Sequence, residues 1–296
     1  MFSKKPPQYL YKYRPFSVNT LRMFSDAEVY FASPASFNDP LDCSPTIEVD
    51  VDIPILEKVL FRLLSDTRSK EAAKAEISNH RYMASEDGDI RVPGPAMDYY
   101  KRRLSAAVQD ALRKAFGKYG VLSLASKWDC PLMWSHYADQ HLGMCLEFEM
   151  DESAECLPVD YTLSRQIRVS DLASWKIDGS TQAKDKVWNS FFLAKAPRWR
   201  YEREWRSVAE TTGPQFVKGR LNAVHFGLRC DASLITTVVM LHAVDPKAVK
   251  FYGIQVREQG FRLVRKRINS EEILIGGVRT SPWLDFRDVV TDETNA

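Results

Sequence analysis

The chain has 296 residues, and its 41 Lys and Arg nearly balance 39 Asp and Glu, leaving a formal net charge of +2. This balance argues against a protein whose main role is to coat duplex nucleic acid or an anionic membrane. Hydrophobic residues make up 45% and charged residues 27%, which excludes wholesale disorder. The composition therefore indicates a globular protein. Its function has to be inferred from the motifs.

No segment reaches the roughly 18 to 20 apolar residues that cross a bilayer, and no apolar run follows the charged start Met1–Pro7. The five cysteines are scattered, and none forms a C-x-x-C pair. We therefore expect a cytoplasmic protein with reduced thiols, without a membrane partner, a disulfide framework or a zinc ribbon.

The first half of the chain predicts two strands followed by helices. Alternation over 10–14 and 29–32 indicates short strands, and the second runs into a cluster of turn-forming residues at 33–40. Residues 55–119 are predicted to be mainly helical. Their apolar stripe repeats at intervals of three and four, and comprises Tyr100, Leu104, Val108, Ala111, Leu112 and Ala115.

The second half is richer in strand patterns. We predict strands at 120–126, 143–150, 199–208, 221–226, 236–241 and 261–268, and helices at 132–138 and 246–259. The sum is an α+β fold: one domain over 1–296, with a mixed or antiparallel sheet, flanking helices and a mainly helical insertion at about 53–119.

The segment K-A-P-R-W-R-Y-E-R-E-W-R at 195–206 has the most distinctive chemistry. In an extended conformation, Glu202 and Glu204 share one strand face, about 7 Å apart, and the arginines at 198, 200 and 206 flank them. Such guanidinium groups keep carboxylates ionised. The alternative is a solvated face whose charges pair with one another, each pair contributing roughly 0 to 1 kcal/mol.

Three further groups carry candidate chemistry. Ser123 and Ser126 lie where a strand leads into a helix N-terminus, which suits a phosphate or carboxylate as well as ordinary capping. His136 and His141 are five apart, which disfavours a helical metal site, so we predict no metal. His136 is either an acid–base partner of Asp139 or a core histidine. The turn 37–42 holds Asn38 and Asp39.

Several nucleotide and hydrolase signatures are absent. The sequence has no G-x-x-x-x-G-K-[ST], no G-x-G-x-x-G after a strand, no G-x-S-x-G and no H-E-x-x-H. Kinases, P-loop ATPases, Rossmann dehydrogenases, α/β-hydrolases and zincins are therefore disfavoured.

Taken in order, the segments Y-K-Y, Y-F-A-S-P-A-S-F-N-D-P-L-D, L-S-L-A-S, L-M-W-S-H-Y-A-D-Q-H-L-G-M-C-L-E-F, Y-E-R-E-W-R and A-V-H-F-G resemble the bacterial domain-of-unknown-function family DUF2971. The resemblance covers about residues 9–268. The family carries no established activity, so it indicates relatives and no reaction.

A second resemblance implies a reaction. Mono-ADP-ribosyltransferases of the arginine–serine–glutamate type carry, in this order, an Arg on the first strand, a Ser motif and a Glu-x-Glu, which Arg14, Ser123 with Ser126, and Glu202 with Glu204 match. The serine motif here reads S-L-A-S, where the transferases usually have Ser-Thr-Ser.

That resemblance implies that NAD is the substrate. Arg14 would hold its diphosphate or ribose, Ser126 or Ser123 would orient the nicotinamide ribose, and Glu204 would stabilise an oxocarbenium-like cation. Glu202 would orient the acceptor. The remaining candidate contacts are Tyr13, Tyr30 and Trp134, one of which would stack on nicotinamide, together with Asn38, Asp39, His136 and Tyr137.

Three function classes follow. The first is an NAD-cleaving transferase with a protein, nucleic-acid or small-molecule acceptor, acting as a toxin or phage-defence effector. The second is a non-catalytic module that senses a nucleotide-like small molecule or binds a partner. The third is a nucleic-acid-binding or -processing protein. This class is supported by the Arg, Trp and Tyr residues at 198–206 and by the basic residues at 262–267.

Overall fold

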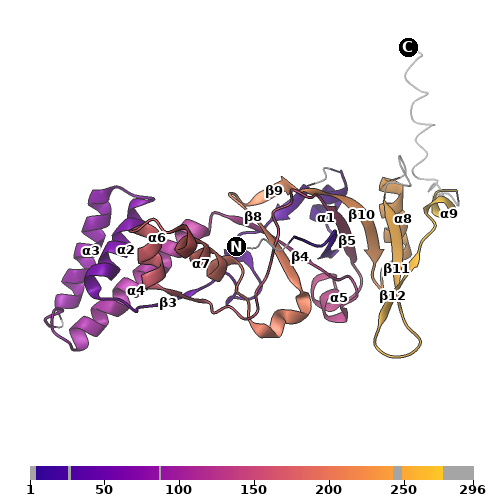
Figure 1. Cartoon of the computed structure of the whole chain (residues 1–296). Helices are drawn as coiled ribbons and strands as arrows, with labels where there is room; N and C mark the ends of the chain where they lie inside the picture. Colours follow the sequence, from indigo (N-terminus) through magenta and orange to yellow (C-terminus); the bar gives the residue numbers. More distant parts are fainter. Residues whose placement is uncertain (1–4, 26–27, 87, 243–248, 276–296) are drawn as a thin grey trace, which may run out of the picture. The chain divides into compact units, whose positions relative to one another are not determined.

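The structure, a computed structural model, describes residues 5–25, 28–86, 88–242 and 249–275 (Figure 1). The chain folds into two compact units. The first is built from residues 1–7, 29–126 and 153–216, and the second from 8–28, 127–152 and 217–296. We describe each unit by itself.

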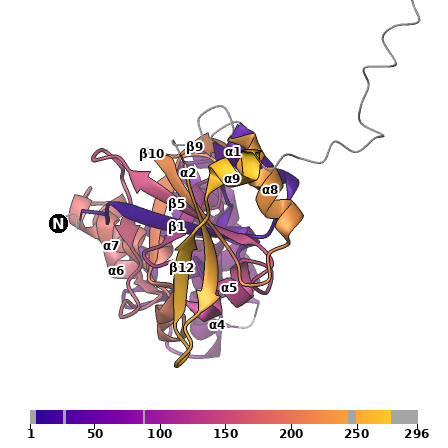
Figure 2. The same cartoon turned by 90° about the vertical axis from the view of Figure 1, so that its right-hand side faces the viewer.

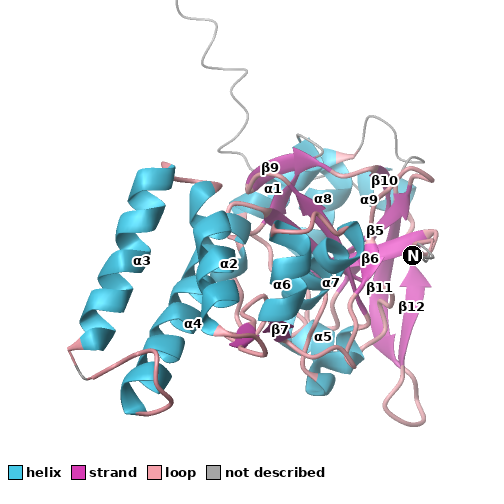
Figure 3. Ribbon diagram, turned by 60° about the vertical axis from the view of Figure 1, so that its left-hand side comes forward, coloured by secondary structure: helices cyan, strands magenta, loops and turns pink. Residues whose placement is uncertain are grey.

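Helices form much of the first unit. They are α2 (Ile53–Ser65), α3 (Lys70–Ser85), α4 (Pro95–Phe116), α6 (Val169–Lys176) and α7 (Thr181–Phe192), drawn as cyan ribbons in Figure 3. The side chains of Asp52, Ser69 and Ser180 cap α2, α3 and α7 by accepting hydrogen bonds from backbone N–H groups. The apolar faces of α2, α4 and α7 share one buried core, which includes Leu60, Leu104 and Phe191.

The strands of the first unit form three small groups. β4 (Gly120–Ala125), β8 (Glu204–Ala209) and β6 (Leu157–Pro158) pair antiparallel, in the order β4-β8-β6. β2 (Glu28–Phe31) pairs with β9 (Gly213–Phe216), and β3 (Thr46–Glu48) runs parallel to β7 (Gln166–Arg168). Two 3₁₀ turns, η1 (Pro34–Ser36) and η2 (Pro197–Glu202), complete the unit.

The second unit is built on five strands in the order β12-β11-β10-β5-β1 (Figure 2). They are β1 (Tyr9–Arg14), β5 (Met144–Met150), β10 (Gly219–Phe226), β11 (Lys250–Val256) and β12 (Leu263–Arg267). Only the β10–β11 pair is parallel among these neighbours. The helices of this unit are α1 (Val18–Ser25), α5 (Pro131–Tyr137), α8 (Ala232–Leu241) and α9 (Ser270–Ile275).

The α+β fold class is confirmed, together with a mixed sheet and helices at 53–116. In the α4 stripe, five of the predicted residues are buried; Ala115 is half-buried, and Phe116 takes the next core position. The likeness to an ADP-ribosyltransferase sheet and the single-domain organisation stay predictions. Within the described part of the chain, no helix is both long and apolar enough to cross a membrane.

Two predicted elements are wrong in type. The β-branched run at 236–241 belongs to α8, because Asp231 caps the helix by accepting from the Ser233 N–H at 2.8 Å. The helix predicted at 246–259 is instead strand β11 over its described part, and residues 246–248 lie outside the described residues.

The predicted strand at 199–208 is correct only in its second half. Pro197 opens the 3₁₀ turn η2, which ends at Glu202; Arg203 then adopts a left-handed conformation with φ of 46°, and β8 begins at Glu204. The turn removes the strict alternation of faces on which the 7 Å separation of the two glutamates depended. Its consequence for these glutamates is described next.

Candidate functional site

A buried ionic cluster in the first unit contains both glutamates of the Glu-x-Glu motif. The Lys195 ammonium donates to Glu202 Oε2 at 2.5 Å and to Glu204 Oε2 at 2.8 Å. The left-handed Arg203 lets both carboxylates reach this one nitrogen, so the predicted spacing along a flat strand face is corrected. We call Asp42, Lys195, Glu202, Glu204 and Arg206 the ionic cluster.

Arg206 is the centre of this cluster. Its guanidinium is fully buried and binds Glu204 through Nε and Nη2, at 2.8 and 3.0 Å. It also binds Asp42 through Nη1 and Nη2, at 2.9 and 2.6 Å, and donates to the Phe192 carbonyl oxygen at 2.7 Å. These bonds connect β8 to the 37–43 loop and to the end of α7.

The cluster is charged at neutral pH. Burial alone would raise the pKa of Glu204, but the charges of Arg206 and Lys195 outweigh it and hold this pKa well below its ordinary range. Burial alone would lower the pKa of Lys195, but the surrounding carboxylates outweigh it and raise this pKa. Glu204 is therefore an ionised carboxylate whose two oxygens already accept three charged hydrogen bonds.

This arrangement limits what the cluster can do chemically. A glutamate that stabilises a ribosyl cation or binds a ribose hydroxyl must offer an oxygen to the ligand. Glu204 is buried, and three of the roughly four lone pairs of its carboxylate already accept from Lys195 and Arg206. In this structure the cluster links three segments of the first unit and stabilises their arrangement. The catalytic roles of Glu202 and Glu204 stay predictions.

The serine and glutamate motifs lie on paired strands. β4 pairs with β8 so that Ser123 lies opposite Arg206 and Ala125 opposite Glu204. The Ser126 N–H donates to the Arg203 carbonyl at 3.1 Å. Arg14 lies in the second unit, at the end of β1, so its convergence with Ser126 and Glu204 stays a prediction.

Several predicted cofactor contacts have structural partners. Asp39 accepts from the Leu41 N–H at 2.9 Å and from the Trp199 indole at 2.7 Å. Tyr13 donates to the Lys127 carbonyl at 2.9 Å, and Trp134 donates to the Trp128 carbonyl at 2.7 Å. The rings of Tyr13 and Trp134 are buried edge to face at 5.3 Å, so neither presents a face to solvent.

The remaining predicted contacts lie nearer the surface. Tyr30 and Asn38 are exposed, and Ser123 is half-buried. His136 is exposed and Tyr137 half-buried at the end of α5, with their rings 6.3 Å apart. Among the residues that the structure describes, no three His, Cys, Asp or Glu side chains are placed to hold a metal ion.

A second polar cluster, in the second unit, was missed at the sequence level. Glu147, in the middle of β5, is buried and accepts from His225 Nε2 at 3.2 Å and from Arg265 Nη1 at 3.0 Å. The Asn222 amide donates to its other oxygen. Burial alone would raise the pKa of Glu147, but these hydrogen bonds and charges lower it to about 2.

Aromatic rings contact His225 and Arg265, two partners of this carboxylate. The His225 ring stacks on Trp128 at 5.7 Å and on Tyr252 at 5.1 Å. The Arg265 guanidinium lies 5.4 Å from the centre of the Trp128 ring and 4.6 Å from that of Tyr252. We call Trp128, Glu147, His225, Tyr252 and Arg265 the aromatic cluster.

His225 has one ring nitrogen in use. Burial lowers its pKa, so the ring is neutral at pH 7 and its Nε2–H donates to Glu147. The Nδ1 atom then carries an unshared pair, and within the described residues it has no hydrogen-bond partner. The unused Nδ1 is therefore a hydrogen-bond acceptor, and burial favours the neutral ring over its protonated form.

Two signals in the sequence point to this cluster. Glu147 is a charged residue inside the apolar run M-C-L-E-F, and His225 belongs to the A-V-H-F-G block. Neither signal says that Arg265 and Trp128 join them, because that follows from strand order and from the position of the loop before α5.

The fold and these sites define an α+β protein with two buried ionic clusters, one in each unit. Residues 133–207 match the family DUF2971, described as a protein of unknown function. The predicted resemblance to this family is thereby confirmed, and the matched segment contains Glu147, Lys195, Glu202, Glu204 and Arg206. Searches of curated proteins and of solved structures gave no match, and nothing in them supports the ADP-ribosyltransferase resemblance.

Proposed function

We propose that this chain is a ligand-binding module for a small nucleotide-like anion, which it holds at the aromatic cluster of the second unit. The observation that carries the proposal is the state of Arg265. Its Nη1 is anchored to Glu147, and the side chain remains 35% exposed. No other hydrogen bond of its guanidinium occurs among the described residues, so donors remain for an incoming anion.

The surrounding rings favour a nucleotide over a simple anion. Trp128 and Tyr252 are half-buried, and both rings lie beside Arg265. Aromatic rings stack on the flat face of a base, and an arginine fork pairs with a phosphate. Arg267 lies 5.3 Å from the Tyr252 ring and adds a second positive charge on β12.

A thermal-shift series on the full chain tests the proposal. The ligands are AMP, NAD, ribose 5-phosphate and inorganic phosphate. We expect AMP and NAD to raise the melting temperature and the two phosphates that lack a base to do so much less. Arg265→Gln should abolish the shift, while Arg262→Gln, an exposed arginine just before β12, should preserve it. No shift with any nucleotide, or equal shifts in both variants, would contradict the proposal.

A second function, cleavage of NAD with transfer or hydrolysis of ADP-ribose, is favoured by Arg14. The Nε atom of this residue is buried, and its side chain makes no ion pair or hydrogen bond within the described residues. Burial lowers its pKa. A half-buried guanidinium without a counter-ion suits an anion such as a diphosphate, the role that the transferase resemblance implies for Arg14.

Nicotinamide release from NAD, followed by chromatography with and without cell lysate, tests this second function. Because Glu204 belongs to the ionic cluster, its variant Glu204→Gln needs a control that weakens the same cluster outside the Glu-x-Glu motif. Asp42→Asn is that control. Release that Glu204→Gln and Arg14→Gln abolish and Asp42→Asn preserves supports cleavage, and absence of release from the wild type refutes it. The cellular role as a toxin or defence effector depends on this result.

A further inference from the structure

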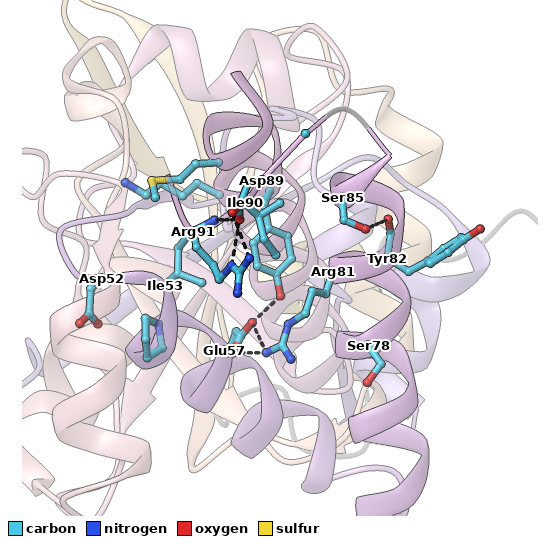
Figure 4. Close-up of a pocket in the computed structure, with 15 residues that line it drawn as sticks. Asp52, Ile53, Glu57, Ser78, Arg81, Tyr82, Ser85, Asp89, Ile90 and Arg91 are labelled. Atoms are coloured by element: carbon cyan, nitrogen blue, oxygen red, sulfur yellow. Dashed lines mark hydrogen bonds and ion pairs between the residues drawn. The ribbon is translucent and has the colours of Figure 1, made fainter. Parts of the chain in front are cut away.

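The helical part of the first unit contains a large pocket that neither proposed function uses. It has a volume of about 1130 Å³ and lies among α2, α3, α4 and the residues that connect α3 to α4 (Figure 4). Pockets that bury small organic ligands are typically about 300–1,000 Å³. The space is therefore sufficient for a ligand of that class.

Two of the three acidic side chains of this pocket have cationic partners. Glu57 accepts two hydrogen bonds from Arg81 Nη2, at 2.7 and 2.8 Å, and one from the Tyr100 hydroxyl at 2.5 Å. Figure 4 shows these bonds as dashed lines. Asp89 binds Arg91 through both oxygens. Asp52 is exposed, caps α2 with one oxygen and makes no ion pair within the described residues.

Two cationic side chains of the pocket keep unused donors. Arg81 uses only Nη2 in its bonds to Glu57, and its side chain is 54% exposed. Lys101, on α4, makes no ion pair or hydrogen bond within the part of the chain that the structure describes. Lys101 and the unused donors of Arg81 thus remain for the acidic group of a ligand.

Part of the remaining lining is apolar or aromatic. Ile53 and Pro54 come from α2, Met97 and the ring of Tyr100 from α4, and Ile90 from the connecting segment. Such walls favour an apolar body that displaces water, at roughly 25 cal/mol per Å² of buried apolar surface. We propose that this pocket binds an organic anion with an apolar or aromatic body, whose acidic group pairs with Lys101 and Arg81.

Two dyes of matched shape test the proposal on the full chain. One is 8-anilinonaphthalene-1-sulfonate, which carries the anionic group, and the other is N-phenyl-1-naphthylamine, which has the same rings without the sulfonate. We expect the folded protein to bind both with enhanced fluorescence, and the sulfonate more tightly. Lys101→Gln should weaken the sulfonate about tenfold, as for the loss of one charge-assisted hydrogen bond, and leave the neutral amine unchanged.

Further variants establish where the dyes bind. Lys74→Gln, an exposed lysine of α3 outside the pocket lining, should leave both affinities unchanged. Met97→Trp places a larger side chain in the pocket and should weaken the binding of both dyes; Ile90→Trp serves the same purpose if the first variant melts early. Unchanged affinity for both dyes in both folded tryptophan variants, a Lys101→Gln protein with unaltered sulfonate affinity, or a wild type that binds neither dye would overturn the proposal.

Discussion

Arg206 and Glu204 form a two-point clamp within one strand, in which Nε and Nη2 of the guanidinium donate to the two carboxylate oxygens at 2.8 and 3.0 Å. Both side chains are buried, and the remaining Arg206 donors bind Asp42 and the Phe192 carbonyl. Removal of the arginine therefore leaves the three carboxylates of the ionic cluster, Asp42, Glu202 and Glu204, with Lys195 as the one remaining cation of the cluster.

Replacement of Arg206 by methionine should lower the free energy of unfolding by about 3–5 kcal/mol, the usual cost of breaking a buried ion pair from one side. Chemical denaturation of the full chain measures this loss. Arg200→Met, at an exposed position of η2, should change stability by no more than about 0.5 kcal/mol. Equal effects of the two substitutions on the free energy of unfolding would show that the ionic cluster does not stabilise the first unit.

Glu147 should make stability depend on acid pH. Its pKa falls from an ordinary 4.5 to about 2 in the folded protein. A carboxyl group whose pKa is lowered by folding contributes its full stability at a pH above its pKa in the unfolded state. This contribution is lost as the pH falls from about 4.5 to 2. The full effect of this one group is about 3 kcal/mol.

Urea denaturation of wild type and Glu147→Gln between pH 6 and pH 2 measures this contribution. The wild type should lose more stability than the variant across the window, because the amide does not titrate. Parallel stability curves for the two proteins would argue that Glu147 is not held ionised by His225, Asn222 and Arg265.

The five cysteines should divide by burial. Cys43, Cys145 and Cys156 are buried, and burial raises the pKa of Cys43 and of Cys156 to about 12. Cys130 and Cys230 are half-buried. Burial also raises the pKa of Cys230, to about 11. Because the thiolate is the reactive form, a disulfide-exchange reagent at pH 8 should modify Cys130 fastest in the native protein, Cys230 more slowly and the three buried cysteines slowest, and it should modify all five after unfolding. Rapid native labelling of Cys43 would contradict its placement beside Arg206.

Gly227 should not tolerate a side chain. An added Cβ would lie 2.1 Å from the His141 carbonyl oxygen, and a backbone atom cannot move aside as a flexible side chain does. Gly227→Ala should cost at least about 1–3 kcal/mol of stability. Gly253→Ala, where the nearest atom would be 3.9 Å away, provides the control and should be close to neutral. The melting temperatures of both variants test this prediction, and equal values would contradict it.

The sequence predicts local structure well where the pattern itself determines it. The 3.6-residue period of α4 identifies the buried faces of Leu104 and Val108 without knowledge of their partners. Alternation likewise locates β1, β4 and β5. The run at 236–241 shows the limit, because the Asp231 cap and the packing of Val238 and Val239 outweigh the strand preference of β-branched residues.

The sites depend on contacts between distant segments and were predicted only in part. The Glu-x-Glu motif was recognised as unusual, but the left-handed Arg203 that directs both carboxylates to Lys195 has no signature in the sequence. The aromatic cluster brings together β5, β10, β11, β12 and the loop before α5. Its members share no local pattern, so His225 and Arg265 become partners of Glu147 only once strand order is known.

Whether Arg265 holds the phosphate of a nucleotide is tested most directly by a thermodynamic cycle. The cycle combines substitution of Arg265 with removal of the phosphate from the ligand. Isothermal titration would give the affinities of AMP and adenosine for wild type and for Arg265→Gln. We predict that the wild type binds AMP at least about tenfold more tightly than adenosine, and that this preference disappears in the variant. A phosphate preference that survives in Arg265→Gln, or its absence from the wild type, would contradict the account.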